Sequence, residues 1–87
     1  MEKIEKDVTI KNAQGLHARP AALFVQIAAK YDASLTVQKG NEIVNGKSIM
    51  GILMLGAQQN SQIRLCAEGE DARQLIEDLE SFLQKNE

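Results

Sequence analysis

Two stretches of the chain carry apolar residues at the spacing of an α-helix. In the stretch nearer the C-terminus, the pattern i, i+3, i+4, i+7 is formed by Ala72, Leu75, Ile76, Leu79, Phe82 and Leu83. This stretch opens with Glu70 and Asp71 and closes near Lys85, an arrangement of charge that suits a helix dipole. In the other stretch, one apolar stripe is formed by Leu23, Phe24, Ile27, Ala28 and Tyr31. The pattern therefore predicts two amphipathic helices.

Other segments alternate between apolar and polar residues, as half-buried strands do. The alternating apolar positions are Ile4, Val8 and Ile10, then Leu35 and Val37, then Ile63, Leu65 and Ala67. Lys6 interrupts the first of these sets. Residues 39–42 read as a turn that leads to Ile43 and Val44, which predicts a hairpin. Each strand has one apolar face, as expected for an antiparallel sheet that is covered on one side only.

The apolar run of residues 48–56 is compatible with a strand or with a short helix. Its methionine and leucine content favours a helix, with Ser48 as the N-cap and Gly56 as the C-cap. The predicted order is then strand, helix, strand, strand, helix, strand, helix, in one α+β domain that spans residues 1–87. One sheet with the helices on one face is the natural packing of these elements.

Composition narrows the class of protein. With two Phe, one Tyr and no Trp in 87 residues, the core must be aliphatic. A net charge of −2 and few stacking aromatics disfavour nucleic-acid binding. No apolar run approaches the ~20 residues of a membrane span, and the N-terminus lacks the apolar core of a signal peptide. With a lone Cys66 and a single histidine, we expect a cytoplasmic protein without a structural zinc site, metal or cofactor.

The segment from Gly15 to Pro20 contains the only histidine and the only proline of the chain. Proline suits the first turn of a helix, so His17 is predicted to lie just before one, beside backbone N–H groups that lack partners. A neutral imidazole is a competent nucleophile near neutral pH. Gly15 permits a tight reversal of the chain and close approach of an anion to the backbone. On its own, however, a histidine at this place is often a surface residue or a cap.

Arg19 supplies a fork of donors that matches phosphate oxygens. In isolation the same residue reads as a solvated charge paired with a nearby carboxylate. A helix N-terminus adds only about 0.3–1 kcal/mol to an exposed anion, enough to orient a phosphoryl group without trapping it. Together, His17 and Arg19 therefore indicate a carrier of a transferable phosphoryl group rather than an enzyme that encloses a substrate.

Ser48 and the run that follows it allow two interpretations. As a cap, Ser48 is structural; a phosphoryl group there would add about −1.5 to −2 charges beside the apolar run and repel a partner docked on it. A short helix cannot bury all of Ile49, Met50, Ile52, Leu53, Met54 and Leu55. The run is therefore either a core segment with one or two exposed residues or a docking patch that methionine makes adaptable.

Residues 15–22 and residues 47–51 resemble the two signature segments of the HPr family, the histidine-containing phosphocarriers of the bacterial phosphoenolpyruvate-dependent sugar phosphotransferase system. The resemblance extends over essentially the whole chain. It implies an open-faced β-sandwich of four antiparallel strands with three helices on one face. It also implies a monomer without cofactors, whose His17 accepts a phosphoryl group on Nδ1 from phospho-enzyme I and donates it to IIA domains of sugar permeases.

The resemblance assigns roles to further residues. Arg19 would hold the phosphoryl group with the backbone amides of Ala18 and Arg19. Ser48 would be modified by HPr kinase/phosphorylase, which slows transfer at the histidine and recruits a catabolite-control transcriptional regulator. Partner docking would fall to Leu16, Pro20, Ile49, Met50 and Leu53.

Three alternatives remain open from the sequence. The segment 52–55 is similar to that of nitrogen-branch relatives, which keep the histidine but report on metabolism. The chain also fits a regulatory binding module that is controlled at Ser48, with His17 secondary. A generic small α/β interaction domain would be phosphorylated at neither site.

Overall fold

The computed structural model describes residues 2–85, which form strands and helices in the predicted order. The strands are β1 (Lys3–Thr9), β2 (Ser34–Lys39), β3 (Glu42–Asn45) and β4 (Gln62–Glu68). The helices are α1 (Ala18–Ala29), α2 (Ile49–Leu55) and α3 (Ala72–Gln84). The assignment of residues 48–56 to a short helix rather than a strand is thereby confirmed.

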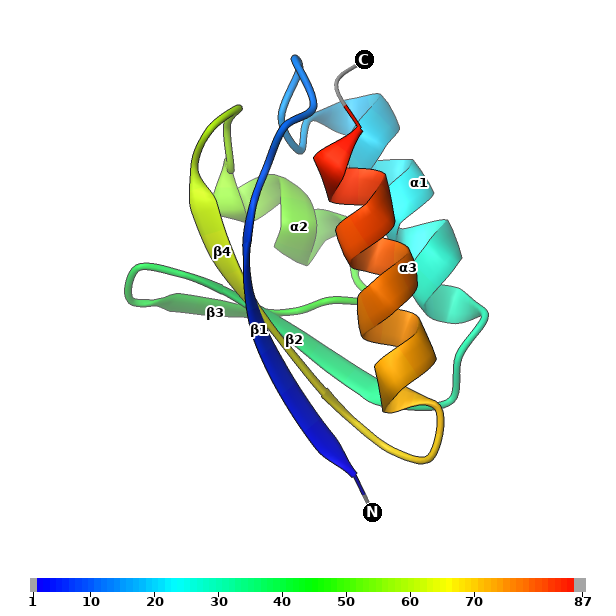
Figure 1. Cartoon of the computed structure of the whole chain (residues 1–87). Helices are drawn as coiled ribbons and strands as arrows, with labels where there is room; N and C mark the ends of the chain where they lie inside the picture. Colours follow the sequence, from blue (N-terminus) through cyan, green and yellow to red (C-terminus); the bar gives the residue numbers. More distant parts are fainter. Residues whose placement is uncertain (1, 86–87) are drawn as a thin grey trace.

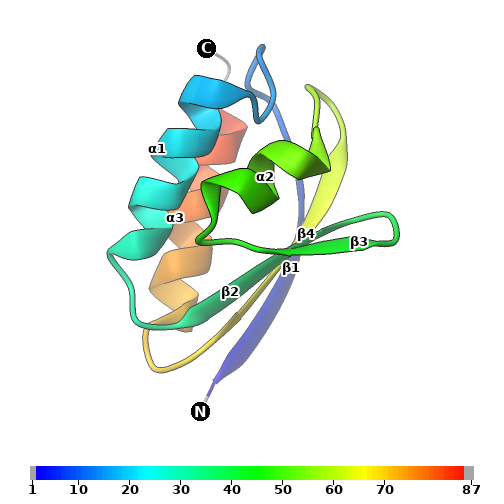
Figure 2. The ribbon, with the colours of Figure 1, turned by 180° about the vertical axis from the view of Figure 1, so that it is seen from behind.

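The four strands form one sheet in the order β1-β4-β2-β3, and every neighbouring pair is antiparallel. Seen from the two opposite sides in Figures 1 and 2, all three helices lie on one face of this sheet and the other face is open. The predicted hairpin joins β2 to β3, with Lys39 paired to Glu42 and Gly40 at a φ of 60° in its turn. The predicted fold class is confirmed.

The apolar face of the sheet and the inner faces of the helices form a single core. Along β4 the buried side chains are Ile63, Leu65 and Ala67, and along β2 they are Leu35 and Val37. Helix α3 covers them with Ala72, Leu75, Ile76, Leu79 and Leu83. Phe24 of α1 is the only aromatic residue among the buried side chains of residues 2–85, so the core is aliphatic as the composition predicts.

Helix α1 is rotated relative to the predicted apolar stripe. Leu23, expected in the core, is 42% exposed, while Ala21 is fully buried with Phe24 and Ala28. Positions 21, 24 and 28 follow one line along the helix, which packs against α2 and α3. Leu23 lies off this line and stays exposed. The expectation for Leu23 is therefore wrong.

Strand β1 lies at an edge of the sheet, and charged side chains add contacts to its backbone pairing with β4. Lys6, which breaks the apolar alternation, forms a 2.9 Å ion pair with Glu80 of α3 and so points toward the helices. Asp7, on the open face, accepts a 2.8 Å hydrogen bond from Arg64 of β4. An inward-pointing charge on an edge strand discourages pairing with another chain. The break in the pattern thus has a structural reason.

The loop between α1 and β2 is fixed by the residue that precedes α3. The Asp71 carboxylate caps no N–H of its own helix but accepts hydrogen bonds from the backbone N–H groups of Asp32 and Ala33, both at 2.9 Å. These bonds favour the charged form, so the pKa of Asp71 lies below its ordinary value of 3.8. The Asp71 carboxylate, which the sequence places at the positive end of the α3 dipole, therefore also connects the loop before α3 to the loop between α1 and β2.

Replacing Asp71 with Asn should lower the unfolding temperature at neutral pH, because an amide oxygen accepts the two N–H groups less strongly. A lowered native pKa stabilises the fold above the unfolded-state pKa and loses that effect as the pH falls through the native value. The difference between wild type and Asp71→Asn should therefore shrink below pH 3.8. Thermal unfolding followed by circular dichroism across this range measures it. Glu70→Gln, a neighbouring carboxylate without a hydrogen bond within residues 2–85, serves as control. An equal difference at all pH values would contradict the prediction.

Candidate functional site

His17 is the N-cap residue of α1, as the sequence predicts. Its backbone is extended, with φ −88° and ψ −164°, and its imidazole makes no capping hydrogen bond. The side chain is exposed. An N-cap histidine that caps nothing leaves both ring nitrogens available for chemistry or for a partner.

The backbone beside His17 offers unpaired donors. The first hydrogen bond of the helix runs from the N–H of Ala21 to the carbonyl of His17, at 2.7 Å. The N–H groups of Ala18 and Arg19 have no partner within residues 2–85, and Pro20 has no N–H. Two free donors at the positive end of a helix dipole therefore adjoin the imidazole and favour an anion there.

Gly15 lets the loop before His17 pack against the segment that follows α2. Its φ is 65°, and a Cβ at this position would lie 2.6 Å from the carbonyl oxygen of Ala57. The next residue, Leu16, donates its N–H to that same oxygen at 2.8 Å. Close approach and left-handed geometry both require glycine here. The start of α1 is thereby fixed beside the end of α2.

Leu16 is not a docking residue. Its side chain is 1% exposed and belongs to the core, because the hydrogen bond to Ala57 turns it inward. The expectation that Leu16 contacts partners is therefore wrong. Pro20, the other predicted docking residue of this segment, is half-buried in the first turn of α1.

Arg19 is exposed and makes no hydrogen bond or ion pair with any residue from 2 to 85. It lines a shallow depression of about 200 Å³, together with Asn12, Gln14, Pro20, Leu23 and Phe82. The sequence also allowed Arg19 to pair with a nearby carboxylate, but no such ion pair forms among the described residues. Its guanidinium is free to serve an external anion.

Asn12 belongs to this site although nothing in its sequence context singles it out. The side chain is 8% exposed. Its Nδ2 donates to the carbonyl oxygens of Phe82 and Lys85, at 3.3 and 3.1 Å, and so ties the end of α3 to the loop before His17. Its Oδ1 is buried without a partner. Asparagine is common in loops, so the sequence around Asn12 gives no signal of its role. The role is visible only in the contact with residues 70 or more positions away.

Ser48 caps α2 as predicted. Its Oγ accepts a 3.1 Å hydrogen bond from the N–H of Gly51. At the other end of this helix, Gly56 takes the left-handed conformation, with φ 58° and ψ 33°. Both caps are local features, which is why the sequence shows them.

Lys47, the residue before Ser48, contacts the chain just beyond the end of α1 that is remote from His17. The ammonium of Lys47 donates to the carbonyl oxygen of Tyr31, just beyond the end of α1, at 2.6 Å. The Tyr31 hydroxyl in turn donates to Asp78 of α3, which raises the pKa of the phenol.

Helix α2 presents an apolar surface. Ile49, Met50, Leu53 and Met54 are exposed, whereas Ile52 and Leu55 are buried in the core. The expectation that this run cannot be wholly buried is confirmed, and four exposed residues exceed the one or two of an ordinary core helix. Ile49, Met50 and Leu53 are the predicted docking residues, and Met54 extends their surface.

Residues 2–85 contain no helix long and apolar enough to cross a membrane. In the same range, no three His, Cys, Asp or Glu side chains are grouped as metal ligands would be. Cys66 is half-buried on the open face of the sheet, near Glu5 of β1. None of these features adds to the site around His17.

Comparison with known proteins identifies a family. The model of the PTS HPr component phosphorylation site matches residues 4–85. The HPr-like protein Crh of Halalkalibacterium halodurans is 43% identical over 82 residues, which cover 94% of this chain and 98% of that protein. The crystal structure of phosphocarrier protein HPr from Bacillus anthracis has a TM-score of 0.93 at 40% identity, covering 97% of this chain and 100% of that one. Crh of Bacillus subtilis, described as a domain-swapped dimer, has a TM-score of 0.77 at 36% identity, with 95% of each chain covered.

Replacing Ser48 with Ala should destabilise the protein by about 1 kcal/mol, the usual contribution of an N-cap side chain. The N–H of Gly51 would lose its acceptor in a partly buried place. Urea unfolding measures the change. Ser48→Asn, which keeps an acceptor, should stay closer to wild type. Equal stability of Ser48→Ala and wild type would show that the cap contributes nothing.

Proposed function

Because the chain belongs to the HPr family of phosphotransferase-system phosphocarriers, we propose that its His17 accepts a phosphoryl group and then donates it to another protein. The observation that carries this proposal is the exposed imidazole beside the two unpaired N–H groups of Ala18 and Arg19. The donor is phospho-enzyme I, charged from phosphoenolpyruvate, and the acceptors are IIA domains of sugar permeases. The protein works in the cytoplasm as a monomer without a cofactor.

The transfer is a simple substitution at phosphorus. The lone pair of Nδ1 on neutral His17 attacks the phosphorus atom carried by phospho-enzyme I, and the bond from that phosphorus to the donor atom breaks with its electron pair going to the donor atom. The His17 ring keeps its Nε2 proton and takes up the positive charge. Donation to a IIA domain repeats the step with the roles exchanged. Such transition states are loose, so positioning and charge supply most of the catalysis.

The surroundings of His17 suit temporary binding. When His17 is phosphorylated, the phosphoryl oxygens accept hydrogen bonds from the backbone N–H groups of Ala18 and Arg19. The Arg19 guanidinium adds positive charge beside them. One exposed helix end contributes about 0.3–1 kcal/mol. Because the group stays exposed, the partner supplies the enclosure that completes the transfer site. Weak retention allows the group to leave again.

The exposed apolar surface of α2 gives partners a place to bind. Ile49, Met50, Leu53 and Met54 lie on it, and α2 packs against α1, which carries His17. Methionine side chains adapt to differently shaped surfaces. One surface can therefore serve enzyme I and several IIA domains in turn.

Ser48 regulates this exchange when HPr kinase/phosphorylase modifies it. Ser48 is the N-cap of α2, so a phosphate on it adds negative charge beside the apolar surface on which partners dock. The phosphate therefore acts on the binding of partners. The same phosphate offers a catabolite-control transcriptional regulator a charged feature to recognise.

A regulatory role centred on Ser48 is the second candidate. The observation that favours it is the similarity to the HPr-like protein Crh, at 43% identity. In this role the modified Ser48 surface binds a regulator and transfer through His17 is secondary. The Bacillus subtilis relative is described as a domain-swapped dimer. The oligomeric state of this chain should therefore be measured by light scattering.

His17→Ala should abolish phosphorylation by enzyme I. In a mixture with enzyme I, Mg²⁺ and phosphoenolpyruvate, the wild type should gain one acid-labile phosphoryl group, because a phosphorylated imidazole hydrolyses in acid. Intact-mass measurement before and after acid treatment reads this out. Ser48→Ala should be labelled like the wild type. An unlabelled wild type would overturn the proposal.

Ser48→Asp should raise the KM for phosphoryl transfer from enzyme I by roughly tenfold, because a docked partner would bury an unpaired charge. The kcat and the hydrolysis rate of isolated phospho-His17 should hardly change, since no hydrogen bond joins Ser48 to His17 within residues 2–85. Steady-state kinetics separate these quantities. Ser48→Ala controls for the lost hydroxyl. A fall in kcat at unchanged KM would instead indicate direct action on His17.

A further inference from the structure

The Asn12 side chain has a defined orientation. Its nitrogen and oxygen cannot be exchanged, because the carbonyl oxygens of Phe82 and Lys85 accept hydrogen bonds and cannot donate them. The amide nitrogen therefore faces the end of α3. Its oxygen points away from these two carbonyls and is left as an acceptor.

That acceptor is buried and unused within residues 2–85. Only 8% of Asn12 is exposed, so bulk water does not satisfy Oδ1. A buried acceptor without a partner is unfavourable, and native proteins contain few of them. An unused acceptor beside a functional residue therefore calls for a donor from the same site.

Arg19 is the donor at hand. It lines the same depression as Asn12 and carries N–H groups that have no partner within residues 2–85. A guanidinium has five N–H donors in a flat fork, so one edge can bind an amide oxygen while another faces a phosphate. In Figures 1 and 2 the start of α1, the preceding loop and the end of α3 lie together at one end of the molecule.

We propose that Asn12 is a positioning residue for Arg19: its buried Oδ1 accepts a hydrogen bond from the Arg19 guanidinium and holds it ready for the phosphoryl group on His17. The amide thus links the end of α3 to the phosphoryl site, with its nitrogen fixed on α3 and its oxygen on Arg19. The role in transfer rests on the proposed function; the contact itself does not. A guanidinium held in place loses less freedom when the anion arrives.

The kinetic test is a double-mutant cycle on transfer from phospho-enzyme I. Asn12→Ala should slow transfer about tenfold, the loss expected for one hydrogen bond to a charged group. In an Arg19→Leu background, Asn12→Ala should cause no further slowing. The same slowing in both backgrounds, or none in the first, would overturn the proposal.

Two further variants separate the oxygen of Asn12 from its nitrogen. Asn12→Asp keeps an acceptor for Arg19 but cannot donate to α3, so it should restore most of the rate that Asn12→Ala loses. Gln84→Ala removes another tie at the same end of α3, the 2.9 Å bond from Gln84 to the Thr9 carbonyl, and should leave transfer unchanged. Slow transfer in Asn12→Asp or Gln84→Ala would mean that anchoring of α3, and not the position of Arg19, governs the rate.

The contact can also be tested without any phosphoryl transfer. In ¹⁵N spectra of the unmodified protein, Asn12→Ala should shift the Arg19 Nε–H signal, and Arg19→Leu should shift the Asn12 side-chain amide signals. Gln84→Ala should leave the Arg19 signal in place. Unchanged signals in both directions would refute the contact. If the wild type were not phosphorylated while these shifts appeared, the proposed function would fail and the contact would stand.

Discussion

The structure depends on one apolar interface, between a single face of the sheet and the inner faces of the helices. The strands expose polar side chains on their other face, so only one layer of helices is needed. Phe24, Leu65 and Leu79 belong to this interface from α1, β4 and α3. Because a buried interface admits no charged reacting group, chemistry is confined to its rim, where helices begin and end. His17 and Ser48 both occupy such helix starts.

Much of the fold can be predicted from the sequence because the signals involved are local. Alternation along β4, the period of α3 and the caps at Ser48 and Gly56 each involve residues a few positions apart. The rotation of α1 could not be predicted. Which of Ala21 and Leu23 is buried depends on where α2 and α3 lie, and periodicity alone contains no such information.

The features of the site also fall into those that neighbouring residues predict and those that depend on tertiary contacts. The positions of His17, Arg19 and Pro20 at the start of a helix follow from neighbouring residues. The inward direction of Leu16 depends on Ala57, 41 positions away (57 − 16), and the place of Asn12 depends on the end of α3. Local sequence thus identifies the reacting group, whereas the contacts that orient its surroundings arise from the tertiary fold.

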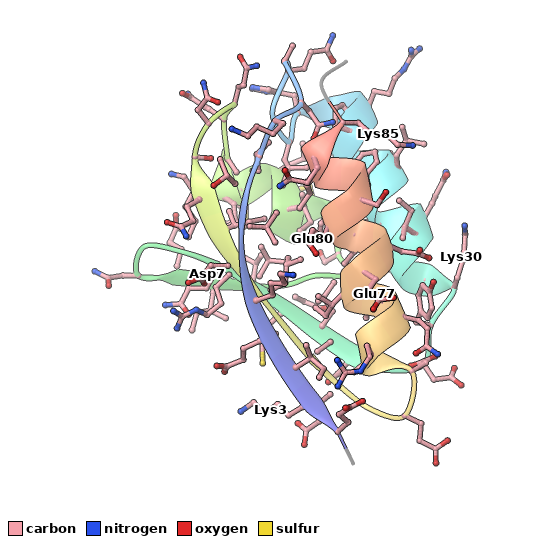
Figure 3. All side chains as sticks on the ribbon, viewed as in Figure 1. Lys3, Asp7, Lys30, Glu77, Glu80 and Lys85 are labelled. Atoms are coloured by element: carbon pink, nitrogen blue, oxygen red, sulfur yellow. The ribbon has the colours of Figure 1, made fainter. Side chains whose placement is uncertain are left out.

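The placement of the two chain ends has a practical consequence. Lys3 lies near the end of the molecule that is remote from the start of α1, whereas Lys85 lies beside that start (Figure 3). The carbonyl of Lys85 is even bound by Asn12, in the loop that leads to His17. An affinity tag or a fused domain placed ahead of β1 therefore leaves the histidine accessible. The same addition placed after α3 emerges next to the histidine and competes for space with any protein that approaches it.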